Sequence, residues 1–209
     1  TKLFESDNEE LFFTKRTKSS LGLNLLQSDR TFISSIKAYP INTEVKVVKS
    51  YSAKKGSVSM ELNTSIIMLP QEPMRPRYHD PRVGYFTESY IDYDKNPQGV
   101  DVTRMITRWR LEPKPEDMER YKAGELVEPA KPIVYYIDPT TPAKWVPYLI
   151  QGVNDWEPVF RAAGFKNAIM AKLAPTKDED STWSLEDARY SAIVYKPSSV
   201  PNASGPHVS

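Results

Sequence analysis

The sequence contains no cysteine and only two histidines in 209 residues. The first absence excludes disulfide bonds, thiolate zinc ligands and cysteine nucleophiles together. The two histidines, His79 and His207, lie far apart, and no H-E-x-x-H pattern is present. Because a hydrolytic zinc site needs three converging protein ligands, we predict no metal ligand and no catalytic residue within this sequence.

Long hydrophobic runs and an excess of charge of one sign are also missing. No apolar run approaches the roughly 20 residues of a membrane-spanning helix, so no membrane span is predicted. The 28 basic and 27 acidic residues give a net charge of +1, which argues against nucleic acid as a partner. There is no signal peptide and no initiator Met, and both ends look cut, so we interpret the sequence as a piece of a longer protein.

Proline and tyrosine are abundant instead, with 18 and 12 residues, which is typical of many short strands and turns. The clearest element is a β-hairpin, in which residues 44–51 alternate and residues 57–69 return after a bend at residues 54–56. The alternation predicts that Val45 and Val47 face inward. The side chains predicted to face water are Glu44, Lys46 and Lys49.

Residues 131–175 read as strand, helix and strand. An apolar, β-branched run at 133–137 has the length of a strand, and residues 167–174 form a second one. Between them we predict a helix over 142–164, with Thr141 as its N-cap. A strand, a crossover helix and a strand of these lengths favour a parallel pair.

The predicted helix has one apolar stripe and one interior proline. The spacing of its apolar residues assigns them to the core, namely Trp145, Leu149, Val153, Trp156, Phe160 and Ala163. Gly164 stands where a left-handed C-terminal cap is expected. Pro158 removes a backbone hydrogen bond, so it either kinks the helix near residues 154–156 or begins a second short helix.

Two candidate metal motifs fit structural roles better. His79 stands beside Asp80 without further ligands nearby, which favours a surface or hydrogen-bonding histidine. Asp92-x-Asp94-x-Asn96 resembles the start of a calcium loop. The loop then requires glycine and glutamate where this sequence has Pro97 and Thr103, so a solvated turn is favoured.

A third motif is basic. Arg104, Arg108 and Arg110 surround Trp109, as in a nucleic-acid patch with an aromatic platform. The balanced net charge and the nearby acidic residues argue against that function. A strand or short helix with an apolar side and an arginine side is the stronger interpretation.

Several stretches, taken in order, resemble one family. They are Met74-Arg75-Pro76-Arg77, Asp80-Pro81-Arg82-Val83-Gly84-Tyr85-Phe86, Arg108-Trp109-Arg110-Leu111, Lys131-Pro132-Ile133-Val134-Tyr135-Tyr136-Ile137-Asp138, Val153-Asn154-Asp155-Trp156, Ala163-Gly164-Phe165-Lys166-Asn167-Ala168-Ile169 and Asp187-Ala188-Arg189-Tyr190-Ser191. They resemble the large, envelope-associated, zinc-dependent metallopeptidases of the metzincin-like type, whose amino-terminal half carries a domain of unknown function. The resemblance covers essentially the whole chain and is best from Pro73 onward.

The resemblance implies an α+β fold in three parts. Residues 1–111 would form a β-rich N-terminal domain, residues 112–130 a charged linker, and residues 131–209 the incomplete N-terminal part of a metallopeptidase catalytic domain. The last part would open a metzincin-like mixed sheet as strand, helix, strand and strand. Their expected ranges are 132–138, 142–164, 167–174 and 188–195.

The resemblance also implies a substrate-binding edge. Its residues would be Gly205, Pro206, His207 and Val208, which enter the next strand and pair with an extended substrate by backbone hydrogen bonds. The H-E-x-x-H helix of the family would lie beyond Ser209, where zinc activates water and a glutamate acts as general base. Pro158 departs from the helix-forming residue expected at its position.

The leading hypothesis is therefore an N-terminal fragment of a zinc-dependent metallopeptidase, inactive by itself, with zinc as a cofactor of the full-length parent. Its partners would be the downstream catalytic half, a peptide or protein substrate, and envelope proteins. The expected location is the cell envelope, periplasmic or secreted. The alternative is a non-catalytic β-rich binding, scaffolding or inhibitory module of a cell-envelope complex, because the extended connector of residues 70–81 could lie across a cleft.

Overall fold

The computed structural model describes residues 2–8 and 13–197. The chain divides into two compact units, which are treated separately. The amino-terminal unit consists of residues up to Leu69 together with the later segment Lys177–Tyr190, and the second unit consists of Pro70–Thr176 together with the segment that begins at Ser191. The predicted α+β class, with a β-rich N-terminal part followed by strand, helix, strand and strand, is confirmed.

The amino-terminal unit contains two short helices, one 3-10 turn and four strands. In chain order they are α1 (Lys2–Glu5), α2 (Lys15–Ser20), β1 (Leu23–Leu26), η1 (Ser28–Arg30), β2 (Phe32–Ala38), β3 (Asn42–Ala53) and β4 (Gly56–Ile67). The segment Lys177–Tyr190 adds no strand or helix to this unit, although it belongs to it.

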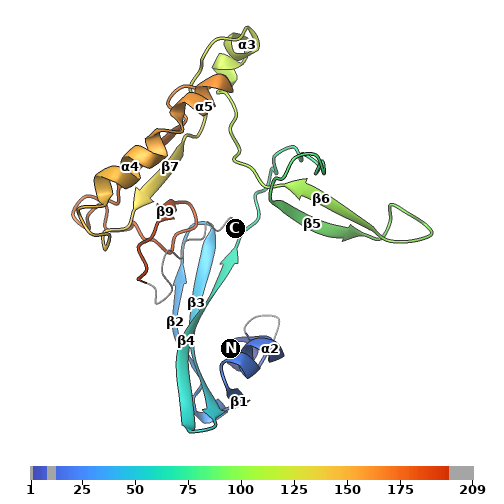
Figure 1. Ribbon diagram of the computed structural model, residues 1–209, viewed down its shortest axis with the longest axis vertical. Helices are drawn as coiled ribbons and strands as arrows, with labels where there is room; N and C mark the ends of the chain where they lie inside the picture. Colours follow the sequence, from blue (N-terminus) through green and yellow to red (C-terminus); the bar gives the residue numbers. More distant parts are fainter. Residues whose placement is uncertain (1, 9–12, 198–209) are drawn as a thin grey trace. The chain divides into compact units, whose positions relative to one another are not determined.

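Strand β3 is the centre of the first sheet. It pairs with β4 along its whole length, antiparallel, from Asn42 opposite Ile67 to Ala53 opposite Gly56. Its other edge is shared, because its first half pairs with β2 and its second half with β1. Figure 1 shows β2, β3 and β4 as a long, twisted ribbon. The central position of β3 explains why it is the most buried strand of this unit.

The predicted hairpin is confirmed. Strands β3 and β4 join through a two-residue turn at Lys54 and Lys55. Gly56 follows with φ of +90°, a conformation that glycine adopts without steric cost.

The predicted sidedness of β3 is wrong at two positions. Glu44 and Lys49 were expected to face water, but their exposed fractions are 4% and 0%. They point to opposite faces of the strand, because side chains alternate along a strand. Both faces of β3 are therefore covered, which an alternating pattern with one polar face does not indicate.

The second unit begins with an extended connector and a two-stranded hairpin. The hairpin strands are β5 (Thr87–Asp92) and β6 (Asp101–Ile106), paired antiparallel. The connector runs along β6, since Tyr78 forms an antiparallel bridge with Met105. The remaining elements of the unit are η2 (Pro115–Asp117), α3 (Met118–Lys122), β7 (Ile133–Ile137), α4 (Val146–Asn154), α5 (Glu157–Ala162), β8 (Ile169–Leu173) and β9 (Ser191–Ile193).

Strands β8, β7 and β9 form one parallel sheet in that order. The parallel pair predicted from the strand, helix and strand pattern is confirmed. Residues 188–195 were expected to form the third strand, and β9 occupies only Ser191–Ile193 of that range. Helices α4 and α5 connect β7 to β8, and Figure 1 shows them end to end.

The helical connection differs from one continuous helix over 142–164. It breaks at Asp155 and Trp156, and Pro158 lies in the first turn of α5, so the second-helix alternative is correct. Thr141 is not the N-cap, because α4 begins at Val146 with Trp145 in the N-cap position.

The stripe interpretation of two tryptophans is wrong. Trp145 is 49% exposed and Trp156 is 57% exposed. Each of them sits at a helix N-cap position rather than inside a helix. A spacing of three and four residues places side chains on one face only when a single helix continues, and here it does not.

The core of the second unit is small and apolar. Val127, Phe165 and Ala168 are buried, with Leu111, Tyr121 and Phe160 packed against them. The rings of Tyr121 and Phe165 stack with centroids 5.0 Å apart. Residues 112–130 thus contribute both a short helix and a core residue to this unit.

Gly164 closes α5 as predicted. Its φ is +94°, the left-handed conformation. A β-carbon at this position would lie 2.7 Å from Cε2 of Tyr121, so the close approach also requires glycine. No helix among residues 2–8 and 13–197 is long and apolar enough to cross a membrane.

Candidate functional site

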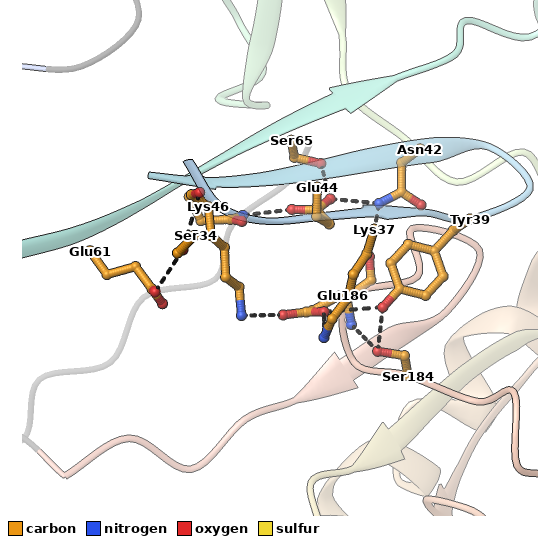
Figure 2. A network of polar contacts seen from close by, with 11 residues as sticks. Ser34, Lys37, Tyr39, Asn42, Glu44, Lys46, Glu61, Ser65, Ser184 and Glu186 are labelled. Carbon is orange, nitrogen blue, oxygen red and sulfur yellow. Dashed lines mark hydrogen bonds and ion pairs between the residues drawn. The ribbon is translucent and has the colours of Figure 1, made fainter. Parts of the chain in front are cut away.

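The densest group of charged and polar side chains lies in the amino-terminal unit, where Lys177–Tyr190 meets the first sheet (Figure 2). We call it the Glu186 cluster. Its members are Lys37, Tyr39, Asn42, Glu44, Lys46, Ser184 and Glu186. The first five come from β2, β3 and the turn between them, and the last two come from a segment more than 130 residues later in the chain.

The carboxylate of Glu186 is surrounded by donors. Lys37 Nζ lies 2.8 Å from Oε2, and Lys46 Nζ lies 2.6 Å from Oε1. The hydroxyl of Tyr39 lies 3.0 Å from Glu186 Oε2 and 3.0 Å from Ser184 Oγ. Figure 2 shows the Glu186 side chain between these partners. Both oxygens are thus occupied by charge-assisted hydrogen bonds.

The two lysines lower the pKa of Glu186. Hydrogen bonds from Lys37 and then Lys46 favour the ionised carboxylate and bring the pKa from 4.5 to about 2, against a smaller opposing effect of burial. The same pairing raises the pKa of both lysines. The carboxylate is therefore ionised over the whole neutral range.

Asn42 holds the backbone of the same segment. Its side-chain amide Nδ2 donates to the carbonyl of Glu186 at 2.8 Å, and its Oδ1 accepts from the N–H of Ala188 at 3.0 Å. Nδ2 also donates to Glu44 Oε1 at 2.5 Å. The buried amide of Asn42 thereby satisfies both its donors and its acceptor.

Glu44 is buried next to Asn42, and its carboxylate accepts hydrogen bonds from three neutral side chains. Besides Asn42, these are Asn63 Nδ2, at 2.5 Å from Oε2, and the hydroxyl of Ser65. The register of β3 and β4 places Ser65 directly opposite Glu44. The side chain of Glu44 therefore links the sheet to Asn42, and through it to the later segment.

The segment itself is shaped by local hydrogen bonds. Asp180 accepts from the backbone of Thr182, which forms a turn before Trp183. Asp187 is 1% exposed and forms a two-pronged ion pair with Arg189 at 2.7 and 3.1 Å. These bonds lower the pKa of Asp187. Glu186 is thus presented to the lysines between two such turns.

The Glu186 cluster is closed, and this limits what it can do chemically. Each carboxylate oxygen of Glu186 already has a cationic or hydroxyl partner. Both polar atoms of the Asn42 side chain are likewise hydrogen-bonded. An arrangement of this kind fixes a segment in place. It connects two parts of the amino-terminal unit rather than presenting a reactive group.

A second polar group attaches the amino-terminal residues to the opposite face of β3. Lys49 Nζ donates to the carbonyl of Ser6, and burial lowers the pKa of Lys49 to about 8. Tyr51, which is fully buried, donates to Asp7 Oδ1 at 3.0 Å, and burial raises the pKa of its hydroxyl. Asp7 also pairs with Lys18 at 2.7 Å.

The sequence-predicted site residues are distributed as follows. Gly205, Pro206, His207 and Val208, the predicted substrate-binding edge, lie outside the described residues. His79 donates its backbone N–H to Arg104 and lines a hollow of about 320 Å³ with residues of β6. The motif from Asp92 forms a turn, since Oδ1 of Asp92 accepts from the next N–H groups at 94 and 95.

The arginines around Trp109 are not gathered on one helix or strand. Arg104 is on β6, whereas Arg108 and Arg110 follow it and donate to carbonyls of the connector. The Trp109 ring packs edge-on against Tyr135 of β7, with centroids 5.9 Å apart. Among residues 2–8 and 13–197, no group of three or more His, Cys, Asp or Glu side chains could hold a metal ion.

Sequence reasoning missed the Glu186 cluster. Neither Asn42 nor Glu186 is singled out in the sequence analysis. The two lysines and Glu186 carry no motif, because Lys37 and Glu186 are 149 residues apart. The available signal was the pair of charged residues Glu44 and Lys46 on one face of β3, which a solvent-facing polar side explains equally well.

These features define a β-rich α+β protein in which charged side chains hold a late segment against an early sheet. Over residues 1–114, more than half of its length, the chain matches the family described as Domain of unknown function (DUF5117). The chain belongs to this family. No curated protein and no solved structure matches it. The match ends before β7, so the parallel sheet lies outside it.

Proposed function

We propose that this chain is the amino-terminal, non-catalytic portion of a zinc-dependent metallopeptidase of the cell envelope. It would supply a scaffold and the start of the substrate-binding edge. The supporting observation is the parallel sheet β8–β7–β9, reached through a helical crossover. A strand, helix, strand and strand in one sheet is the opening that the resemblance to metzincin-like enzymes implies.

The described residues do not fit a zinc ion, because they offer no group of three or more suitable ligands. The proposal therefore assigns the zinc ligands and the general base to polypeptide beyond Ser209. In this proposal the chain contributes side chains that hold strand β8 in place. Asn154 Oδ1 accepts from the N–H of Ala171 on the outer edge of β8, and Glu157 accepts from the N–H groups of Asn167 and Ala168 just before it.

The experiment compares the 209-residue chain with the product of the complete gene. Both are assayed on a quenched fluorescent peptide with zinc and with a chelator. We expect no cleavage by the 209-residue chain and chelator-sensitive cleavage by the complete product. Zinc-dependent cleavage by the 209-residue chain, or a gene that encodes no H-E-x-x-H after Ser209, would contradict the proposal.

The location is tested separately. We expect the complete product in the periplasmic, outer-envelope or secreted fraction after cell fractionation. Recovery with a cytosolic marker would contradict an envelope peptidase. Co-purification of envelope proteins with the chain would support envelope partners.

A second candidate function is regulation of the catalytic half by the amino-terminal unit. Lys177–Tyr190 leaves the second unit after β8, belongs to the amino-terminal unit, and returns at β9. The amino-terminal unit thus holds the connection between two strands of the parallel sheet. In the complete product, Asn42→Ala should raise cleavage if this hold is inhibitory, and unchanged cleavage would count against inhibition.

A further inference from the structure

One group of arginines in the second unit has no acidic partner among the residues that the structure describes. Arg75, Pro76, Arg77 and Arg108 line a hollow of about 330 Å³, here called the arginine hollow. None of its three guanidinium groups pairs with a carboxylate of the described residues. Charges of one sign held close together without a partner raise the free energy of the site, and an anion relieves it.

Several other arginines of the chain pair with carboxylates. Arg82, the residue after the connector, pairs with Asp80 at 2.6 Å, and Arg120 pairs with Asp117 at 2.8 Å. Arg189 pairs with the buried Asp187. In these three cases the arginine forms an ion pair with a carboxylate of the same chain and so contributes to the fold. Arg104 and Arg161 also form no ion pair with a carboxylate of the described residues, but the arginine hollow differs because three such arginines line one cavity.

The hollow is held in shape by backbone contacts. Arg108 Nη2 donates to the carbonyl of Arg75 at 2.6 Å, and Arg110 Nη1 donates to the carbonyl of Glu72 at 2.8 Å. The connector between them is extended and contains Pro73 and Pro76, whose rings restrict the backbone. Preorganisation of this kind lowers the entropy lost on binding.

The connector is also anchored on β6. The N–H of Ile106 donates to the carbonyl of Arg77 at 2.9 Å, and the N–H of His79 donates to the carbonyl of Arg104 at 3.0 Å. The connector therefore lies beside β6 and pairs with it through one isolated antiparallel bridge, between Tyr78 and Met105. An extended peptide can add to such an edge by backbone hydrogen bonds while its side chains reach adjacent pockets.

We propose that the arginine hollow binds a carboxylate carried by an acidic peptide segment. Guanidinium groups match a carboxylate with two parallel hydrogen bonds, and Arg108 keeps donors beyond the one given to Arg75. A cavity of this size lies within the range of small-ligand pockets. Glu72 lies within the connector, and Glu112 pairs with Arg110, which donates to the Glu72 carbonyl. These acidic residues disfavour a long polyanion such as nucleic acid.

The test measures fluorescence anisotropy of a labelled ten-residue peptide of alternating glutamate and serine, titrated with the 209-residue chain. A peptide with glutamine in place of glutamate is the ligand control. We expect the acidic peptide alone to bind, with an affinity that falls as salt is added. Equal binding of the glutamine peptide would overturn the proposal.

Variants locate the site. Arg75→Gln and Arg77→Gln should each weaken binding of the acidic peptide about tenfold or more, since each removes a charged donor to the ligand. Arg82→Gln is the matched control, because it removes the same charge from an arginine already paired with Asp80, and it should change the affinity less than twofold. An equal loss with Arg82→Gln would show nonspecific attraction and overturn the site.

A competition experiment tests which class of anion the arginine hollow binds. Inorganic phosphate and a single-stranded oligonucleotide are used as competitors, and stronger binding of either than of the acidic peptide would contradict a peptide carboxylate as the ligand.

Arg108→Lys tests the geometry. It keeps the charge but loses the planar, forked guanidinium group, so it should still weaken binding of the acidic peptide several-fold. Thermal unfolding of each variant checks that the fold is retained. None of these outcomes depends on peptidase activity, so the inference can fail independently of the proposed function.

Discussion

The two units differ in how their charged side chains are paired. In the amino-terminal unit, Glu44 and Glu186 are surrounded by partners from the same unit, and the closed cluster joins Lys177–Tyr190 to the sheet. In the second unit, the core is apolar and three arginines line a hollow without a carboxylate among the described residues. A closed cluster stabilises its own unit, whereas an open one gains stability only when a ligand arrives. Mutations should therefore affect stability in the first case and binding in the second.

The largest effect is expected from Asn42→Ala. The change leaves the carbonyl of Glu186 and the N–H of Ala188 without their partner in a partly buried place. It also removes one of the two donors to Glu44 Oε1, so we expect a cost of about 3 kcal/mol in the free energy of unfolding. Urea denaturation measures it, and hydrogen exchange at Ala188 should quicken. Ser34→Ala in β2 is the control, since the exposed hydroxyl of Ser34 donates to groups that remain in contact with water, and the change should cost under about 1 kcal/mol. Equal losses in the two variants would break the comparison.

Gly164→Ala tests the apolar core of the second unit. We expect a loss of about 2 kcal/mol, because alanine is strained at a φ of +94° and its β-carbon would meet Tyr121. The loss should not depend on pH, since no charged group is involved. Gly152→Ala in α4 is the matched control. It meets nothing within 4 Å and should stabilise the helix by about 0.5–1 kcal/mol. Thermal unfolding of both variants at two pH values measures these changes, and the same sign for both would contradict this account.

Glu186→Gln tests the electrostatic part of the closed cluster. The folded-state pKa of Glu186 is lowered from 4.5 to about 2, so its contribution is fully present above pH 4.5 and is lost as the pH falls toward 2. At neutral pH we expect a loss of about 1–2 kcal/mol, less than the whole shift implies because Lys37 is partly in water. The difference from the wild type should shrink between pH 4.5 and 2 in urea denaturation curves. A difference that stays constant down to pH 2 would contradict the assigned role of the carboxylate.

The smallest stability effect is expected from the arginine hollow. Arg75→Gln and Arg77→Gln should change the free energy of unfolding by less than about 0.5 kcal/mol, because neither side chain bonds to the described residues. They should instead lower the stabilisation that a saturating acidic peptide confers on the wild type by about 1.4 kcal/mol or more, which corresponds to at least tenfold weaker binding. Thermal shifts with and without peptide measure both effects. A large loss without peptide would place these arginines among the structural ones.

Much of the local structure could be predicted from the sequence. The hairpin of β3 and β4, the parallel pair of β7 and β8, and the left-handed glycine at 164 follow from alternation, strand length and turn chemistry. These features depend on residues close together in the chain. Pro158 marked the start of α5 for the same reason, since its effect on the backbone is local.

The tertiary structure decided which polar residues are buried. Glu44 and Lys49 have the local pattern of exposed residues, yet Asn42 and the late segment cover one and the amino-terminal residues cover the other. Trp145 and Trp156 have the spacing of core residues, yet both are exposed, because Trp145 precedes the first residue of α4 and Trp156 lies in the break between α4 and α5. The composition gives only the total charge of the chain. Whether an arginine is paired depends on which carboxylates the fold brings within reach of it.

The sequence by itself determined where strands and turns form, because backbone preferences and short-range alternation act over a few residues. It did not determine that Glu186 would meet Lys37 and Lys46, or that Arg75, Arg77 and Arg108 would share one hollow. Those pairings join residues up to 149 positions apart. They exist only after the chain has folded, since the energy of a charge depends on the partners and the solvent that the fold places beside it.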